Sequence, residues 1–255
     1  MDSGAAPGVF LQSVKLLVRN PKIIVPGLVL GGVGAILGAL LEPKSGSLDG
    51  DAFLRFVQAV VEVIVAILAV ACTTGMADVA WNGGTPSFPA AWRAFRRDVL
   101  PTVLVLFGVS VAAALLAPLT LGLSYFVDIF FLLYAMPAAI VGGRRGIEAV
   151  RESIDIALSR MGPTILIVAA IVIISTVMSV VALSLEATPF AGPLIAAIVV
   201  QLTVTYVTVV IVGEYLSTSG RQGPSVKIGA AKPPVKIGAA RPPDAPPGPD
   251  SRAQG

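Results

Sequence analysis

The chain contains no histidine and one cysteine, Cys72, among its 255 residues. Histidine is the commonest general base and metal ligand, so its absence excludes His-Glu-x-x-His zinc proteases and histidine-dependent serine hydrolases. A single cysteine excludes a disulfide framework and a cysteine-rich metal site within one chain. We therefore expect a protein that is not an enzyme, with no catalytic residues, no metal site and no cofactor.

Charge is also scarce. Charged residues make up 13% of the chain, whereas soluble domains carry about 25%. Apolar residues make up 55% of the sequence, and the mean hydropathy is +0.88. These values exclude an ordinary soluble globular protein and a wholly disordered chain. We expect an all-α integral membrane protein that has the lipid bilayer as its main partner and binds no nucleic acid.

Apolar runs of about 20 residues, the length that crosses a bilayer, occur six times. The expected spans are Ile23–Leu41, Phe56–Met76, Val99–Leu116, Tyr125–Val141, Thr164–Leu185 and Pro193–Val212. Turn residues between Pro118 and Ser124 separate the third and fourth spans, which indicates a hairpin. Pro137 is expected to kink the fourth span near its end.

A short amphipathic segment, ended by a proline-containing break, precedes each odd-numbered span. The apolar faces of these segments consist of Phe10, Val14 and Leu17 in the first, Trp92, Phe95 and Val99 in the second, and Ile147, Val150, Ile154, Leu158 and Met161 in the third. The pattern predicts three hairpins, each led by an interfacial helix. The alternative stays open that any basic loop beside a membrane helix looks amphipathic.

The sequence divides into three regions: an amphipathic lead-in over residues 1–22, a six-helix membrane domain over 23–216, and a tail over 217–255. The tail repeats Val-Lys-Ile-Gly-Ala-Ala-Lys-Pro-Pro at 226–234 almost unchanged at 235–243. Proline at this density cannot build a packed core, so we expect a disordered tail. Its basic residues could tether it to anionic lipid or to a protein, or the tail could be a duplicated spacer.

Lysine and arginine are distributed unequally between the two sides of the expected bundle. With both termini on one side, that side carries 16 of these residues, and the other side carries two, Lys44 and Arg55. Loops rich in Lys and Arg stay in the cytoplasm. We therefore expect both termini to be cytoplasmic and the protein to be a multi-pass protein of the cell (inner) membrane.

Three polar residues lie within the expected spans: Glu62, Asp128 and Gln201. An ionised carboxylate in hydrocarbon costs at least about 2.5 to 3.5 kcal/mol, which makes such residues candidates for a functional site. Glu62 and Asp128 are expected at similar depth, so they could share an outward-opening pocket that Gln201 joins. Alternatively, Glu62 is protonated in a helix contact and Asp128 reaches interfacial water.

Glycines recur along one side of the first span. Gly27 and Gly31, and then Gly34 and Gly38, have the spacing that lets two membrane helices approach closely. The packing partner could be a helix of the same chain, another membrane protein or a second copy. A partner within the bundle is the simpler interpretation.

Three short segments in residues 88–215 carry a family resemblance. They are Tyr134-Ala-Met-Pro137, Ala149-Val-Arg-Glu-Ser153 and Gly162-Pro163. They resemble segments of the six-helix prokaryotic membrane proteins related to the membrane domain of glycerophosphodiester phosphodiesterases. The sequence differs from that family in having Gly142-Gly143-Arg144-Arg145 where an acidic residue is common, and it has no phosphodiesterase domain. The resemblance implies a six-helix architecture and no particular activity.

These observations favour a non-enzymatic accessory or scaffold protein of the cell envelope. The alternative is a small permease or channel-like subunit that uses the intramembrane carboxylates Glu62 and Asp128. Action on lipids as an enzyme is the remotest interpretation, because the sequence lacks a nucleotide-binding loop, a paired-aspartate motif and any histidine.

The expected topology can be tested by cysteine accessibility on a Cys72→Ser background. A cysteine that replaces Ser47 should react with a membrane-impermeant maleimide added outside intact cells, because the loop near Asp49 is expected on the outer face. Labelling that requires permeabilised cells would contradict the orientation.

Overall fold

The computed structural model describes residues 5–41, 48–89, 92, 101–109, 111, 116, 119–120, 123–186 and 192–220. These residues form helices and turns, with no strand among them, which confirms the all-α prediction. The repeats of the predicted tail and residues 42–47 and 187–191 lie outside the described residues.

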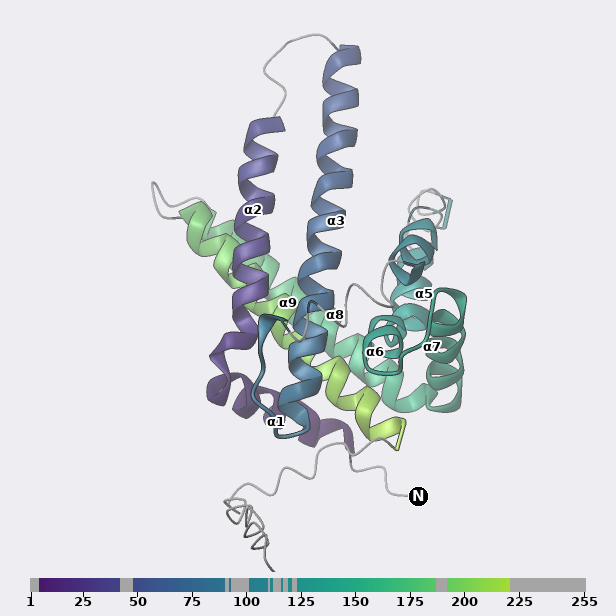
Figure 1. Ribbon diagram of the computed structural model, residues 1–255. Helices are drawn as coiled ribbons and strands as arrows, with labels where there is room; N and C mark the ends of the chain where they lie inside the picture. The colour runs from purple at the N-terminus through teal and green to yellow at the C-terminus, as the bar shows by residue number, and fades with distance from the viewer. Residues whose placement is uncertain are drawn as a thin grey trace, which may run out of the picture.

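The chain begins with two helices that meet at a sharp bend. Helix α1, Ala5–Arg19, is followed by the 3-10 turn η1, Pro21–Ile24, and by α2, Val25–Leu41. The bend between the two apolar segments measures 97° (Figure 1). Proline has no backbone N–H and a fixed φ, so Pro21 favours the end of one helix and the start of the next. The predicted lead-in is therefore a separate helix that crosses the base of α2.

Three helices have the length and apolar composition to cross a membrane. They are α3, Leu48–Trp81, α8, Met161–Glu186, and α9, Gly192–Thr218. The bent pair formed by α1 and α2 would be a fourth if it counts as one span. Six spans are therefore not confirmed. Of the expected third span, the described residues include a helical stretch at 101–109 and single residues at 111 and 116.

The expected fourth span is not one continuous helix. It is divided into α5, Leu123–Leu132, and α6, Ala135–Ile140, with a turn at Leu133 and Tyr134 between them. The prediction of a kink near the end of this segment placed the distortion too late. A proline inside a helix clashes with the carbonyl group four residues before it, and for Pro137 that residue is Leu133. The helix therefore breaks ahead of the proline.

In two amphipathic helices, the residues buried within the protein are not those of the predicted apolar stripe. In α7, Ile147–Ser159, the buried residues are Ala149, Ser153 and Ala157, whereas the predicted stripe residues Ile147 and Leu158 are 67% and 50% exposed. Small side chains let α7 approach its neighbours closely, so the large apolar side chains turn outward. Helix α1 shows a similar arrangement. Its most buried residues are Val9, Ser13 and Leu16, its Phe10 and Leu17 are partly buried, and Val14 is exposed.

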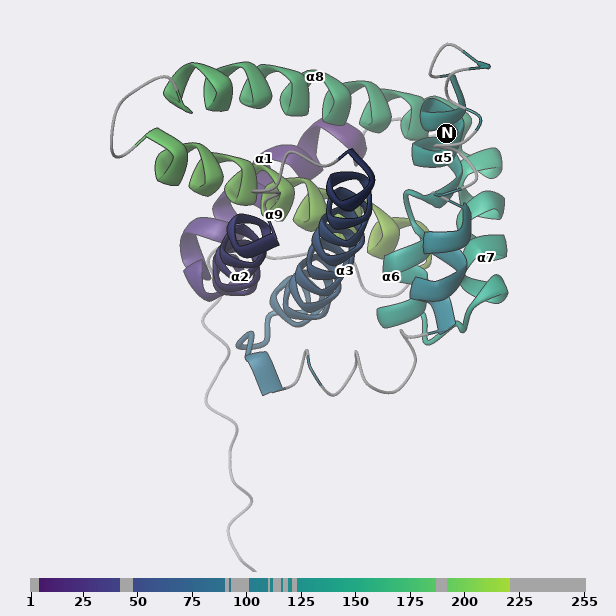
Figure 2. The same cartoon turned by 90° about the horizontal axis from the view of Figure 1, so that it is seen from above.

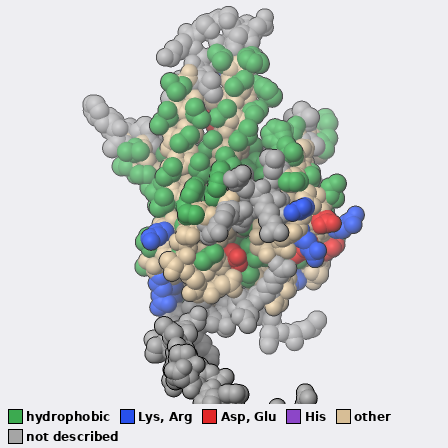
Figure 3. Space-filling view, in the orientation of Figure 1, with side chains coloured by type: hydrophobic (Ala, Val, Ile, Leu, Met, Phe, Trp, Pro, Cys, Tyr) green, Lys and Arg blue, Asp and Glu red, His purple; other side chains and the backbone are tan. Residues whose placement is uncertain are grey.

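The helices form two inclined groups. Seen from above, α2 and α3 are viewed nearly along their axes, while α8 and α9 run side by side across them (Figure 2). Helix α9 is the shared element, because it contacts α1, α2, α3, α6 and α8. Hydrophobic side chains cover the upper part of the molecule, and Lys and Arg gather in the lower half, level with α1 and α7 (Figure 3).

A core cluster holds the charged end of the bundle together. Trp81, the last residue of α3, is buried and donates its indole N–H to the carbonyl oxygen of Val209 in α9 over 3.1 Å. Val9 and Leu16 of α1 belong to the same cluster. Gly213 of α9 faces the indole ring, since a Cβ atom at this position would lie 2.6 Å from Trp81 Cζ2. The close approach of α3 and α9 therefore requires glycine at position 213.

We expect Gly213→Ala to lower the free energy of unfolding by about 1 to 3 kcal/mol, because the buried indole ring cannot move aside without repacking. Thermal unfolding in detergent would measure the loss. Gly32→Ala is the matched control. Nothing lies within 4 Å of a Cβ atom at Gly32, so alanine should leave stability unchanged or raise it by up to about 1 kcal/mol. Equal effects of the two substitutions would contradict the packing argument.

Candidate functional site

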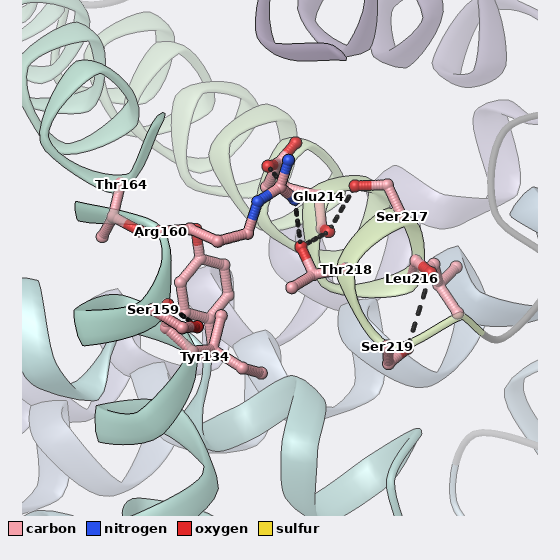
Figure 4. A network of polar contacts seen from close by, with 10 residues as sticks. Tyr134, Ser159, Arg160, Thr164, Glu214, Leu216, Ser217, Thr218 and Ser219 are labelled. Atoms are coloured by element: carbon pink, nitrogen blue, oxygen red, sulfur yellow. Dashed lines mark hydrogen bonds and ion pairs between the residues drawn. The ribbon is translucent and has the colours of Figure 1, made fainter. Parts of the chain in front are cut away.

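A network of polar side chains lies where the break between α5 and α6 meets α7, the start of α8 and the end of α9. Its members come from segments far apart in the chain, including Tyr134, Arg160 and Glu214 (Figure 4). Most of the residues that line the rest of the core are apolar. This network is therefore the main polar feature of the described interior and the first candidate for a functional site.

Ser153 of α7 bridges the break in the α5–α6 segment. Its hydroxyl donates to the carbonyl oxygen of Phe131 over 2.6 Å and accepts from the backbone N–H of Tyr134 over 3.0 Å. A broken helix frees backbone groups that are costly to leave unpaired in an apolar environment. Ser153 satisfies one group on each side of the turn. It can do so because the small residues Ala149 and Ala157, one turn away on either side, let α7 lie close to the α5–α6 segment.

Arg160 connects the start of α8 with the end of α9. Its Nη1 atom lies 3.3 Å from Glu214 Oε1 and donates to Thr218 Oγ1 over 2.8 Å (Figure 4). The Glu214 side chain is 1% exposed, whereas the Arg160 side chain is 32% exposed. A buried carboxylate requires a partner, and the arginine reaches it from the surface. The ion pair therefore fixes the ends of two long helices to each other.

A second ion pair lies at the outer edge of the network. Glu152 of α7 accepts from Arg144 Nε over 2.6 Å and from the Tyr215 hydroxyl over 2.7 Å. Arg144 lies in the turn after α6, so the carboxylate links that turn to α9. The hydrogen bond to Glu152, and next the charge of Glu152, raise the pKa of Arg144. The pairing with Glu152 therefore stabilises the charged form of Arg144.

The buried tyrosine at the break completes the network. The Tyr134 hydroxyl lies 3.5 Å from Thr164 Oγ1 in the first turns of α8, and the side chain is 1% exposed. Tyr134 thus contacts the same helix that Arg160 precedes. The network joins α6, α7, α8 and α9 through paired groups. Chemically, this arrangement holds helix ends in place.

Glu62, a predicted site residue, lies on an exposed face of α3. Its Oε1 atom accepts from Gln58 Nε2 of the same helix over 2.9 Å. This contact is a helix-surface pair one turn apart. Glu62 is not among the residues that line the cavity described next.

Asp128 of α5 lines a cavity of about 460 Å³ between α3, the helical stretch at 101–109, α5, α6 and α9. Thr74 and Thr208 are the other polar residues of the lining, and most of the remaining residues are apolar, among them Val63 and Met136. The predicted pair thus has its two carboxylates in different settings: Asp128 lines a partly open pocket, and Glu62 lies on the exposed surface of α3.

Gln201 lies on the opposite side of the bundle, where α9 packs against α2. A Cβ atom on Gly31 would lie 2.5 Å from Gln201 Nε2, and one on Gly27 would lie 2.9 Å from Thr205 Oγ1. The structure therefore places these two glycines against α9 of the same chain. Gly34 faces α3, where its Cβ would lie 3.3 Å from Val65 Cγ1, and the surroundings of Gly38 lie outside the description.

Sequence reasoning missed Glu214, Arg160 and Ser153. Glu214 lies within the predicted membrane domain but two residues beyond the last expected span, which ends at Val212, and Arg160 lies among the expected cytoplasmic loop cations. One signal was available: Glu214 is a single carboxylate at the end of a long apolar run, and such a group needs a cation. The sequence pattern does not show which cation pairs with Glu214, because the pairing depends on how α8 and α9 pack side by side.

No protein-family model, curated protein or solved structure matches this chain. The resemblance carried by residues 134–163 therefore stays a prediction.

We expect Arg160→Met to lower the free energy of unfolding by about 2 kcal/mol, because it leaves Glu214 buried without its cation. The value lies below the roughly 3 to 5 kcal/mol of a fully buried pair, since Arg160 is partly exposed. Adding Glu214→Gln should recover much of this loss. Chemical denaturation in mixed micelles would measure the free energy of unfolding of the single and the double variant. The control is Arg151→Gln, which changes an exposed residue of α7 and should alter this free energy little. Additive losses in the double variant would contradict the ion-pair role.

Proposed function

We propose that the protein is a non-enzymatic accessory or scaffold protein of the cell envelope. The observation that carries this proposal is that the ionisable groups of the polar network at the charged end pair with one another. Glu214 pairs with Arg160, and Glu152 pairs with Arg144 and Tyr215. Neither Arg160 nor Glu214 lines the cavity that contains Asp128. Groups that are paired with one another stabilise the bundle and are poorly placed to act on a substrate.

The exposed surface of α8 supports a role in assembly. Ile173, Val177 and Val180 are all more than half exposed, and the apolar window of α8 is 17% buried within the chain. Large exposed apolar surfaces face lipid or another protein. We assign part of this surface to a membrane-protein partner or a second copy of the chain.

The membrane arrangement is part of the same proposal. It retains six spans in three hairpins, an inner-membrane location and cytoplasmic termini. The clustering of Lys and Arg at the level of α1 and α7 supports this orientation, because positively charged segments stay on the cytoplasmic side (Figure 3). The position of α1, a helix that crosses the base of α2, supports an interfacial location.

A second candidate function, a small permease or channel-like subunit, is favoured by the cavity alone. Asp128, Thr74 and Thr208 give it a polar part, and its volume of about 460 Å³ suits a small solute. In this alternative Asp128 contacts the solute. Glu62, the other predicted carboxylate, would act from outside the cavity.

A photo-crosslinking amino acid at Ile173 tests the accessory role. On irradiation of intact membranes we expect an adduct of discrete mass, because a partner would occupy a fixed position on α8, whereas lipid adducts leave the protein band almost unchanged. The mass of the adduct, read by mass spectrometry, distinguishes a second copy from a different protein.

Ion and solute flux in proteoliposomes provides the complementary measurement. The accessory role predicts flux no greater than in protein-free vesicles. Flux that falls in Asp128→Asn and persists in Glu62→Gln, together with no protein adduct at Ile173, would reject the accessory role in favour of the permease.

A further inference from the structure

A groove runs along the first turns of α2, at the charged end of the bundle. It has a volume of about 510 Å³ and lies between the start of α2, Met76 of α3 and residues 86–88. Its lining consists of Lys22, Val25, Pro26, Val29, Leu30, Met76, Pro86, Ser87 and Phe88. The lining contains one charged group, Lys22, and its other side chains are apolar apart from that of Ser87.

The walls of this α2 groove suit a hydrocarbon chain. Val29 is 58% exposed and Val25 is half exposed, while Met76 is buried at the base. Phe88 stacks on Trp92 with ring centroids 6.1 Å apart and an interplanar angle of 15°. Stacked aromatic residues beside an apolar surface are typical of the membrane–water boundary. The groove therefore lies where acyl chains meet headgroups.

The cations beside the groove lack partners within the described chain. Lys22 lies in η1, and Lys15 and Arg19 are exposed on α1. None of the three makes an ion pair with a described acidic residue, whereas Arg144 and Arg160, at the other side of this end, are both paired. Lys22 in the groove lining and the two cations of the preceding helix α1, all unneutralised by the described residues, indicate an anion from outside the chain.

We propose that the α2 groove binds an anionic phospholipid, with one acyl chain along Val25 and Val29 and the phosphate beside Lys22. Charge complementarity selects a negatively charged headgroup, and the apolar walls select a lipid over a free phosphate. Lys15 and Arg19 add to the positive potential that the headgroup meets. The site does not depend on the accessory role proposed above, since a transporter could carry it equally well.

The test uses delipidated full-length protein in neutral detergent, titrated with dioleoyl phosphatidylglycerol or dioleoyl phosphatidylcholine and read by native mass spectrometry. We expect phosphatidylglycerol to bind at least about fivefold more tightly, which is the contribution of one basic residue near an anionic headgroup. Lys22→Gln should bring its affinity close to that of phosphatidylcholine. Val29→Phe should weaken both lipids, because the larger side chain occupies the groove.

Arg151→Gln is the matched control, since it removes one exposed cation from α7, away from the groove. It should leave the preference for phosphatidylglycerol unchanged. Equal losses in Lys22→Gln and Arg151→Gln would show that general surface charge, and not this groove, attracts the lipid, and would overturn the proposal. Equal binding of the two lipids would also overturn it, as would displacement of phosphatidylglycerol by glycerol 3-phosphate at the same concentration.

Discussion

The turn at Leu133 and Tyr134 interrupts the helix within an apolar segment. One hydroxyl group forms hydrogen bonds with two of the backbone groups that this interruption frees. Ser153 accepts from the backbone N–H of Tyr134 and donates to the carbonyl oxygen of Phe131. A backbone group that is left unpaired in such surroundings costs several kcal/mol, so the break exists only with α7 docked against it. The position of α7 then sets where the chain turns into α8. This contact therefore fixes α7, and with it the start of α8, against the α5–α6 segment.

The polar groups beyond Ser153 follow from the same geometry. Once α7 is docked, Glu152 lies within reach of Tyr215, and Arg160 lies within reach of Glu214. Each pair joins a segment near the break to the end of α9. Helix α9 in turn holds α2 through the close approach at Gly27 and Gly31, and α3 through Gly213. Small residues make these contacts close, because helices in an apolar solvent gain from packing and not from hydrophobic exclusion.

The two ends of the protein therefore have different physical roles. The apolar end exposes large side chains, such as those of α8, that suit lipid or a partner helix. The charged end contains every described ion pair, and it also carries the unpaired cations beside the α2 groove. The ion pairs therefore order the charged end, and surfaces that suit lipid or a partner helix lie at both ends of the bundle.

Composition and periodicity by themselves determined the all-α class, the apolar character of the long helices and the break at Pro21, because these depend on local backbone chemistry and on transfer from water to hydrocarbon. They placed the distortion caused by Pro137 too near the end of its segment. They did not determine which face of α7 is buried, because close packing there favours Ala149 and Ser153 over larger apolar residues. They also did not determine that Glu62 faces outward while Asp128 borders a cavity, or that Glu214 meets Arg160, 54 residues away. Such pairings depend on how α8 and α9 pack across the bundle, and this packing is a property of the tertiary structure alone.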